Sequence, residues 1–535
     1  MSTAALSLPA NRRTVNPWLV AAAVVIPTFM EVLDTTIANV ALRYIAGGLS
    51  AAVVDSEWVI TSYLAANAVI LPISGWISAR LGRRNYFMLS IVVFTASSML
   101  CGLATSLPQL ILFRVIQGLA GGGLQPSSQA ILLDAFPPEK QGGAMTVFGL
   151  AALVGPVVGP TLGGYLTDNY NWRWIFYINV PVGLIALAAC YKTVTDPDYL
   201  REQRSELLKR PLNFDYIGFG LLALGMSCWE TVLSKGQQWD WFGDPFWRVQ
   251  TLTVLIALAL GFLIFRELRI HNPVVNFRPL KERNFVVSCI IIFCAYGVLY
   301  AASISLPGLL QSLFNYDAYH SGLVMSPAGI FAIGVLLVGG VLLRFGVDAR
   351  WLILVGLIIV GGADYWMSQM NLEISPWQVA GPRIVMVMGL SLIFAPLNVA
   401  AYMYTPRELR AAAVGLFSLL RNEGGSVGTS IAQTLQERRE QFHLLRLNEQ
   451  LDLFNHNLNT FAEQMRAYFF QHYGDWPGAQ QMTWQALANL RQQQASSLAF
   501  FDVFWVAAIV AFCLVFLVFF MKRSVAEKGA HVAAD

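Results

Sequence analysis

Long apolar runs, each closed by charged residues or by Pro, Asn and Gly turns, follow one another along almost the whole chain. A helix that spans a bilayer needs about 20 predominantly apolar residues, and these runs are of that order. We therefore predict fourteen membrane-spanning helices, an even number that places both chain ends on one side of the membrane. Their approximate ranges are 18–41, 58–79, 86–106, 108–133, 143–167, 174–192, 215–234, 247–265, 285–311, 321–343, 351–369, 377–403, 411–435 and 500–521.

One segment breaks this pattern, because residues 436–499 are rich in Gln, Asn and Glu. Its apolar residues recur at helical spacing, which predicts amphipathic helices. Examples are Phe442, Leu445, Leu447, Leu451 and Phe454. Two interpretations remain open: a solvated helical hairpin that packs on itself, and a surface that binds a partner protein.

The composition agrees with a protein that lies in a membrane. Hydrophobic residues make up 56% of the 535 residues and charged residues 13%, with a mean hydropathy of +0.55, whereas an average soluble domain is roughly 25% charged. A soluble protein with a single core is excluded, and an all-α polytopic membrane protein surrounded by membrane lipids is predicted. The net charge of +3 does not favour a nucleic-acid partner. The six cysteines lack the spacing of a metal site or a disulfide framework, so neither is expected.

The Lys and Arg residues are distributed unevenly among the connecting segments. If the N-terminus is cytoplasmic, 23 of the 35 fall on the cytoplasmic side and only four in the short loops opposite. Short cytoplasmic loops carry such an excess, whereas long loops cross the membrane largely regardless of charge. We therefore predict a multi-pass protein with both termini cytoplasmic and 436–499 extracytoplasmic.

Two recurring patterns indicate an internal repeat. The sequence GxxxxRxG at 75–82 recurs at 339–346, 264 residues later, and Arg383 follows Arg114 at an offset of 269. Spans 1–6 would then correspond to spans 9–14, with spans 7 and 8 inserted between two six-helix halves, as in parallel-repeat transporters. The predicted parts are 1–192, the N-terminal six-helix half; 193–270, a cytoplasmic linker and the two inserted helices; 271–435, helices 9–13 of the C-terminal half; 436–499, the hydrophilic helical loop; and 500–535, the last helix and the cytoplasmic tail.

Ionisable residues at membrane depth are the first candidates for function. A charged side chain there costs at least about 2.5–3.5 kcal/mol, so it usually faces a cavity or a partner. Burial raises the proton affinity of a carboxyl group, which makes Asp34 a candidate for binding a transported proton. Glu31 lies on the same helical face, and two close carboxyl groups resist ionising together. Arg114 stays protonated and would act as a fixed charge near a mobile proton. For all three, a purely structural contact with backbone or a partner remains open.

Several ordered motifs extend the argument. Gly75, Arg80, Gly82, Arg83 and Arg84 form the loop after span 2. The other motifs are LDTTIANVA at 33–41, RVIQG at 114–118, GPVVGPTLGG at 155–164, NWRWIFYINVP at 171–181 and GGSVGT at 424–429. Together they resemble the fourteen-helix drug:proton antiporters of the major facilitator superfamily, and within that family the EmrB-type multidrug exporters. The resemblance covers nearly the whole chain.

The resemblance implies the major facilitator fold with two additional helices. It also implies export of lipophilic or amphipathic drugs from the cytoplasm by alternating access, driven by a proton gradient and without a cofactor. Arg114 is expected to take part in proton transfer. The implied location is the bacterial inner membrane, and the implied partners are a periplasmic membrane-fusion adaptor and an outer-membrane channel.

The resemblance also assigns residues to gating. The loop motif is expected to lock the cytoplasmic side, and the glycines and prolines of span 5 are expected to bend that helix and seal the path between the halves, although ordinary tight packing remains an alternative. The chain has Ala79 where the family has an acid, and Asp134 is the expected substitute partner for Arg83 or Arg84. The predicted gating residues are Gly75, Arg80, Gly82, Arg83, Arg84, Asp134, Gly155, Pro156, Gly159, Pro160, Gly163 and Gly164.

Aromatic and polar residues inside the spans are candidates for a cavity that binds flat lipophilic cations, although such residues more often face lipid or the core. They are Phe29, Tyr63, Gln117, Tyr296, Tyr300, Phe394, Asn398, Arg421 and Glu423.

Other classes of function are weighed against transport of drugs. A membrane-embedded lipid-modifying enzyme would need a cluster of His, Asp or Glu at one interface, and no histidine has such a neighbour in the sequence. The sequence has no GxxxxGK[ST] loop, which excludes an ATP-driven pump of that type. An exporter of a dedicated metabolite or fatty acid, and a non-catalytic assembly or sensor protein, remain alternatives.

Overall fold

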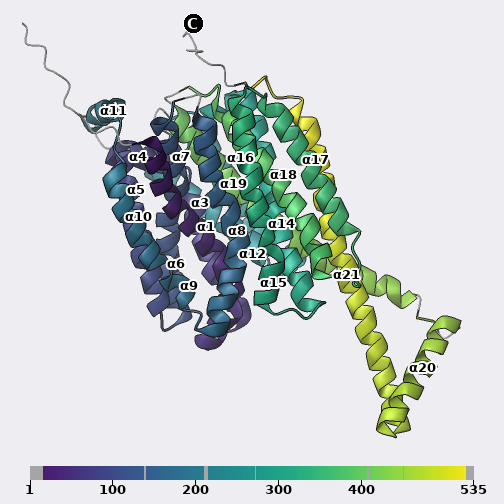
Figure 1. Ribbon diagram of the computed structural model, residues 1–535. Helices are drawn as coiled ribbons and strands as arrows, with labels where there is room; N and C mark the ends of the chain where they lie inside the picture. Colours follow the sequence, from purple (N-terminus) through teal and green to yellow (C-terminus); the bar gives the residue numbers. More distant parts are fainter. Residues whose placement is uncertain are drawn as a thin grey trace, which may run out of the picture.

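The computed structural model describes residues 16–137, 140–209, 215–270, 273–406, 409–449, 451–452 and 454–525. Within these ranges the chain forms helices joined by turns and contains no β-strand. The helices lie side by side in one bundle, from which a helical arm projects at one end (Figure 1). The short helix α11 (Asp198–Lys209) lies at the opposite end.

The N-terminal half contains six predicted spans, three of which consist of two consecutive helices. In the second span, α3 and α4 meet at an angle of 60°. The helices are α1 (Pro17–Gly48), α2 (Val53–Ser56), α3 (Trp58–Ile70), α4 (Ser74–Leu81), α5 (Arg83–Leu103), α6 (Leu107–Gly121), α7 (Leu124–Ala135), α8 (Gln141–Asn169), α9 (Trp174–Tyr177) and α10 (Asn179–Thr193).

The two inserted helices, α12 (Tyr216–Lys235) and α13 (Arg248–Glu267), pack against each other and are joined by the short 3-10 helix η2 (Trp241–Gly243). Asp215 caps α12 through the amide of Gly218 and accepts hydrogen bonds from Arg266 of α13, the shortest at 2.9 Å. Partial burial alone would raise the pKa of Asp215, but these hydrogen bonds outweigh it and hold the pKa below its ordinary value. The ionised carboxylate therefore fastens the two inserted helices together at one end.

The C-terminal half begins with a short 3-10 helix, and one hydrophobic cluster extends through both halves. The elements are η3 (Arg278–Lys281), α14 (Arg283–Ser312), α15 (Ala318–Met325), α16 (Pro327–Arg344), α17 (Ala349–Ser368), α18 (Pro376–Tyr402), α19 (Arg410–Glu449), α20 (His456–Tyr473) and α21 (Trp476–Val518). Helices α19 and α21 continue beyond the bundle into the arm (Figure 1).

The prediction of fourteen spans is compatible with this architecture. Among the described residues, eleven helices are long and apolar enough to cross a membrane, and the bent pair α3 and α4 makes twelve. The two remaining predicted spans correspond to α8 and α19, which are 29 and 40 residues long and lie in the same bundle. Crossing by these two helices stays a prediction.

The two halves share the local features that the repeat predicted. Gly82 follows α4 with φ +89°, and Gly346 follows α16 with φ +84°. This left-handed conformation strains any residue with a Cβ, which explains why glycine ends both copies of the pattern. Arg114 on α6 and Arg383 on α18 are both fully buried.

Glycines bring α14 and α19 into direct backbone contact. A Cβ built on Gly424 would lie 2.7 Å from the carbonyl carbon of Phe293, and one built on Gly428 would lie 2.6 Å from the carbonyl carbon of Gly297. Neither backbone can yield as a flexible side chain would. The GGSVGT motif therefore sets how closely the thirteenth predicted span approaches the ninth.

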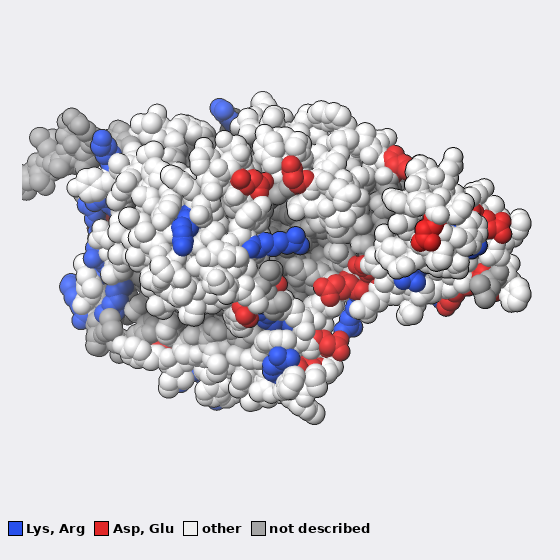
Figure 2. All heavy atoms as spheres, turned by 90° about the horizontal axis from the view of Figure 1, so that it is seen from below, with Lys and Arg blue, Asp and Glu red and all other residues white. Residues whose placement is uncertain are grey.

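The hydrophilic segment 436–499 forms the arm together with residues on either side of it. Helix α19 runs without a break through residue 436 and α21 through residue 499, so the predicted boundaries at these positions do not coincide with helix ends. Near its base the arm is held by Arg439 and His443, which contact the carboxylate of Asp502 at 2.5 and 2.7 Å. Seen from this end, the molecule is hollowed beside the arm, and acidic side chains flank the hollow (Figure 2).

We predict that Gly428→Ala lowers the melting temperature of the purified protein, because the added methyl group pushes α19 away from α14. Overpacking of this kind costs about 1–3 kcal/mol. Gly362→Ala is the matched control, since a Cβ on Gly362 meets nothing within 4 Å. Its melting temperature should stay equal or rise. Equal loss in both variants would show that the close approach of α14 and α19 is not the cause.

Candidate functional site

The predicted acid and arginine of the N-terminal half form a buried ion pair. Asp34 lies in the middle of α1 and Arg114 on α6, and their side chains meet at 2.5 Å with no exposure to solvent. Removing either partner would leave an uncompensated charge inside the bundle. The chain therefore contains a charge pair at a depth where neither member is stable alone.

The carboxylate of Asp34 also receives two neutral donors. Gln117 on α6 donates to it at 3.0 Å, and Asn179 at the start of α10 donates at 2.7 Å. Asn179 is itself oriented by Ser98 on α5, at 3.0 Å. Helices from across the N-terminal half thus converge on one carboxylate.

Arg114 is held by more than its ion pair. Its Nε donates to the carbonyl oxygen of Val59 at 3.0 Å, and its guanidinium lies 4.1 Å from the centre of the Tyr63 ring. Tyr63 and Gln117 were predicted to line a substrate cavity, and the structure places both against Arg114. One guanidinium nitrogen, Nη2, has no hydrogen-bond partner among the described residues.

Glu31 lies one turn before Asp34 and belongs to a different set of contacts. Gln125 of α7 and Asn67 of α3 donate to its carboxylate, Asn67 at 3.2 Å. Arg421 of α19 in turn donates to the amide oxygen of Gln125. A chain of polar side chains therefore connects Glu31 of the N-terminal half to Arg421 of the C-terminal half.

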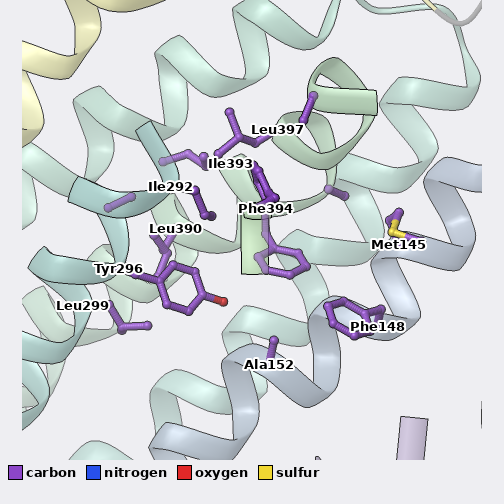
Figure 3. Packing of buried hydrophobic residues seen from close by; sticks show 14 of the residues in the cluster. Met145, Phe148, Ala152, Ile292, Tyr296, Leu299, Leu390, Ile393, Phe394 and Leu397 are labelled. Carbon is purple, nitrogen blue, oxygen red and sulfur yellow. The ribbon is translucent and has the colours of Figure 1, made fainter. Parts of the chain in front are cut away.

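Three of the predicted cavity residues, Tyr296, Tyr300 and Phe394, gather around Arg421 together with Phe148. Its guanidinium lies 5.6 Å from the ring centre of Tyr296 and 5.7 Å from that of Phe148. Tyr296 stacks on Tyr300 at 6.2 Å, and Phe148 stacks on Phe394 at 6.0 Å. Figure 3 shows Phe148, Tyr296 and Phe394 approaching one another from three helices. This aromatic cluster, Phe148, Tyr296, Tyr300 and Phe394, lies where the two halves meet.

The remaining predicted cavity residues have separate surroundings. Asn398 accepts a hydrogen bond from Gln129 of the other half at 3.2 Å, close to this meeting surface. Phe29 is half-buried on α1. Glu423 lies away from the aromatic cluster, because its carboxylate accepts a hydrogen bond of 2.7 Å from the indole of Trp229 on the inserted helix α12.

The glycines of the fifth predicted span fit against the helix that carries Asp34. A Cβ built on Gly155 or Gly163 would lie within 3.0 Å of α1 side chains, those of Val32 and Ile37, and Gly159 packs as closely on Thr36. Gly164 is buried and Pro160 half-buried, whereas the side chain of Pro156 lies outside the described residues. Helix α8 continues through both proline positions as one helix. Helix α8 therefore packs closely against α1 beside the ion pair.

The loop motif at the other end of the bundle forms a compact polar cluster. Arg83 pairs with Asp134, and the backbone amide of Arg84 donates to Asp196 at 2.8 Å. Arg204 of α11 donates to the carbonyl oxygen of Arg80 at 3.1 Å. Gly82 lies beneath these side chains, and Gly75 is half-buried on α4. Asp134 thus provides an acidic partner for Arg83, although the loop motif itself has Ala79 in place of an acid.

Sequence reasoning missed four charged residues, two that contact the loop motif and two that are buried on other helices. Asp196 and Arg204 lie in the linker, where no motif marks them. Asp364 of α17 is fully buried, and neither of its carboxylate oxygens has a hydrogen-bond partner among the described residues. Glu230 is equally buried on α12. Both of these acids are single charges inside apolar runs, a signal that was available in the sequence.

Comparison with known proteins identifies the family to which the chain is similar in sequence and in fold. Residues 24–429 match the family model described as Major Facilitator Superfamily. The chain is 36% identical to a multidrug export protein EmrB of Haemophilus influenzae, over 94% of this chain and 95% of that one. It is 35% identical to the multidrug export protein EmrB of Escherichia coli K12, over 92% and 93% of the two chains. Among solved structures, the human organic anion transporter MFSD10 has the same fold, with a TM-score of 0.56, 14% identity and coverage of 94% and 99%.

We predict that Arg83→Asp and Asp134→Arg each lower the melting temperature, and that the double variant recovers part of the loss. The reason is that exchanging the charges restores an ion pair, for which a coupling energy of about 0.5–1 kcal/mol is expected at this partly exposed site. The control is Arg84→Asp combined with Asp134→Arg, because the structure pairs Asp134 with Arg83. Equal recovery in both double variants would contradict a specific pair.

Proposed function

The chain belongs to the major facilitator superfamily as an exporter of the EmrB type, and from this premise we propose that it moves lipophilic or amphipathic compounds out of the cytoplasm in exchange for protons. The observation that carries the proposal is the fully buried ion pair of Asp34 and Arg114. A carboxylate that binds a proton only when its arginine moves away can alternate between two protonation states. That its relatives are exporters favours transport over an enzymatic role.

The proton step follows from the contacts of Asp34. With Arg114, Gln117 and Asn179 in place the carboxylate has one charge partner and two neutral hydrogen-bond donors. If the halves rock and Arg114 turns away, burial disfavours the charge and Asp34 takes up a proton. Return of Arg114 expels that proton. Arg114 keeps its own charge throughout and acts by position.

Glu31 offers a connection between proton and substrate. It reaches Arg421 through Gln125, and Arg421 lies beside the aromatic cluster. A compound that binds between the aromatic rings would therefore displace or strengthen contacts of the same chain of polar groups. Coupling then needs no direct contact between the compound and Asp34.

The charge of Arg421 changes the expected substrates. The guanidinium is buried beside the aromatic rings, and no carboxylate pairs with it among the described residues. Flat lipophilic cations, which aromatic residues alone would favour, are therefore repelled from this position. Neutral amphipathic compounds and lipophilic weak acids fit the cluster better, because their oxygens can accept hydrogen bonds from Arg421.

The chain is an integral multi-pass membrane protein, and we propose that it lies in the bacterial inner membrane with both termini in the cytoplasm. The uneven distribution of Lys and Arg supports this orientation. In the structure, the loop motif, α11 and the end of α21 lie together at one end of the bundle, opposite the arm (Figure 1). The arm would then extend into the periplasm.

The arm supports a proposal about partners. Many of its large apolar side chains are exposed, among them Phe454, which is 92% exposed, as well as Tyr473 and Trp476. Exposed apolar surface of this kind marks an interaction site in a soluble environment. We propose that the arm binds a periplasmic membrane-fusion adaptor that leads to an outer-membrane channel.

We predict that Asp34→Asn abolishes proton-driven export while leaving the protein folded and inserted, because the amide keeps the shape of the side chain and removes the titratable proton. Proton-driven uptake of a fluorescent substrate into inverted vesicles measures this. Glu440→Gln, which removes a carboxylate on the arm, is the matched control and should transport normally. Undiminished uptake by the Asp34 variant would refute the role assigned to this carboxylate.

We also predict that replacing residues 446–490 with a short Gly/Ser linker separates transport from protection of cells. The change removes α20 but keeps the contacts of Arg439 and His443 with Asp502, and loop length itself costs little stability. Inverted vesicles should still accumulate substrate, whereas whole cells should lose resistance. Equal loss in both assays would mean that the arm belongs to the transporter's own fold.

A further inference from the structure

The inserted helix α12 connects the two halves along one side of the bundle. It packs against α3 of the N-terminal half and α19 of the C-terminal half. Lys235 binds Glu57, just before α3, at 2.6 Å. On the other side, Ser430 of α19 donates to the carbonyl oxygen of Leu233 at 2.8 Å, and Gln237 donates to Glu437 at 2.7 Å. If α3 and α19 move relative to each other, the contacts on at least one face of α12 must therefore change.

Two carboxyl groups face each other where α12 meets α19. Glu230 of α12 is 2% exposed and Glu423 of α19 is 5% exposed. Their carboxyl groups are within hydrogen-bonding reach of each other, and Ser426 contacts Glu230 as well. Trp229 donates to one oxygen of Glu423, whereas the other oxygen, Oε1, and Oε2 of Glu230 have no donor among the described residues.

No cation among the described residues neutralises this carboxyl pair. Lys235 is engaged with Glu57, and Arg421 is directed to Gln125 and the aromatic rings. Helix α3 has no charged residue within its length, and α13 carries its charges only at its ends, at Arg248, Arg266 and Glu267. Helix α14 carries Arg283 only as its first residue, and α19 carries, besides Arg421 and Glu423, Arg410 as its first residue and further charges from Glu437 onward. The remaining titratable groups along these helices are phenols and thiols, among them Tyr63 of α3, Cys228 of α12, and Cys289, Cys294, Tyr296 and Tyr300 of α14.

Two ionised carboxylates cannot remain in contact at this depth without a cation. Their repulsion adds to the cost of burying each charge, and a proton between them removes both penalties and supplies the missing donor. We propose that Glu230 and Glu423 together bind one exchangeable proton, separate from the site at Asp34, and that this proton holds α12 against α19. Binding forms one O–H bond on a carboxylate oxygen, and release returns the proton to water.

The proposed site assigns a role to the inserted helix α12. With the proton bound, α12 is fastened to both halves. When the proton leaves, the two carboxylates repel, and α12 separates from α19 while Lys235 keeps it on Glu57. The extracytoplasmic seam beside α12 then opens. Only this consequence for transport rests on the proposed function; proton-dependent contact between α12 and α19 is a property of the folded protein.

Crosslinking between the two helices tests the contact directly. Gln237→Cys and Glu437→Cys replace a hydrogen-bonded pair formed by the turn after α12 and by α19. The background carries Cys513→Ser, which removes an exposed thiol. Disulfide formation in purified protein is followed from about pH 6 to about pH 9, above the ordinary range of a glutamate. The same thiols in a Glu423→Gln background correct for thiol ionisation. We expect the ratio of the original to the Glu423→Gln rate to fall roughly tenfold as pH rises, the factor that corresponds to about 1.4 kcal/mol.

Two controls make the result specific. Glu230→Gln should flatten the pH dependence as Glu423→Gln does, because an amide donates to the remaining carboxylate at any pH. Asp364→Asn, which alters a buried acid on a different helix, should leave it unchanged. Identical pH curves with and without the Glu423 carboxyl, or equal flattening by Asp364→Asn, would overturn the proposal.

Infrared difference spectroscopy provides a second measurement that does not depend on the cysteines. Raising the pH of the otherwise unaltered protein should remove absorption of a protonated carboxyl group. That component should be missing in Glu230→Gln and in Glu423→Gln but present in Asp34→Asn. Its persistence in both glutamine variants would overturn the proposal. Since transport is not measured, failure here differs from failure of the proposed antiport, which Asp34→Asn tests.

Discussion

The cost of burying charge inside a membrane determines how this protein is arranged. Asp34 and Arg114 satisfy that constraint by pairing, with Gln117 and Asn179 completing the contacts of the carboxylate. Glu31 satisfies it through the neutral amide donors Asn67 and Gln125, and Gln125 in turn accepts a hydrogen bond from Arg421 of the other half. Both sets of contacts join helices that are distant in sequence. The contacts that stabilise the buried charges therefore also determine which helices must move together.

Small residues complement these polar contacts. The glycines of α8 lie against α1 beside the ion pair, and those of α19 lie against the backbone of α14. Such helix pairs are too closely fitted to slide without clashes, and they behave as rigid units. The inserted helix α12 differs, because it and the turn that follows it are joined to α19 by several hydrogen bonds. The fold therefore combines rigid glycine-packed pairs with a seam whose strength depends on charge.

Much of this architecture could be predicted from the sequence, because apolar runs, charge bias and the repeated GxxxxRxG pattern are local signals. They gave the all-helical membrane fold and identified Arg114 and Asp34. The partners of Glu423 and Arg421 could not be predicted, because they lie on helices nearly 200 or more residues away. The continuity of α19 and α21 through residues 436 and 499 could not be predicted, since a helix that passes from an apolar to a polar sequence keeps its backbone hydrogen bonds and changes only its side chains.

One consequence follows from the length of α19. This single helix carries Gly415, which lies against Leu71 and Pro72 at the break between α3 and α4, and then Arg421 where the two halves meet. Its last residues form the first helical segment of the arm. Its 40 residues span about 60 Å at the usual rise per residue. A rigid rod of that length is a lever. A tilt of about 10° at its inner end would displace its outer end by roughly 10 Å, so the arm would report mechanically on events deep in the membrane.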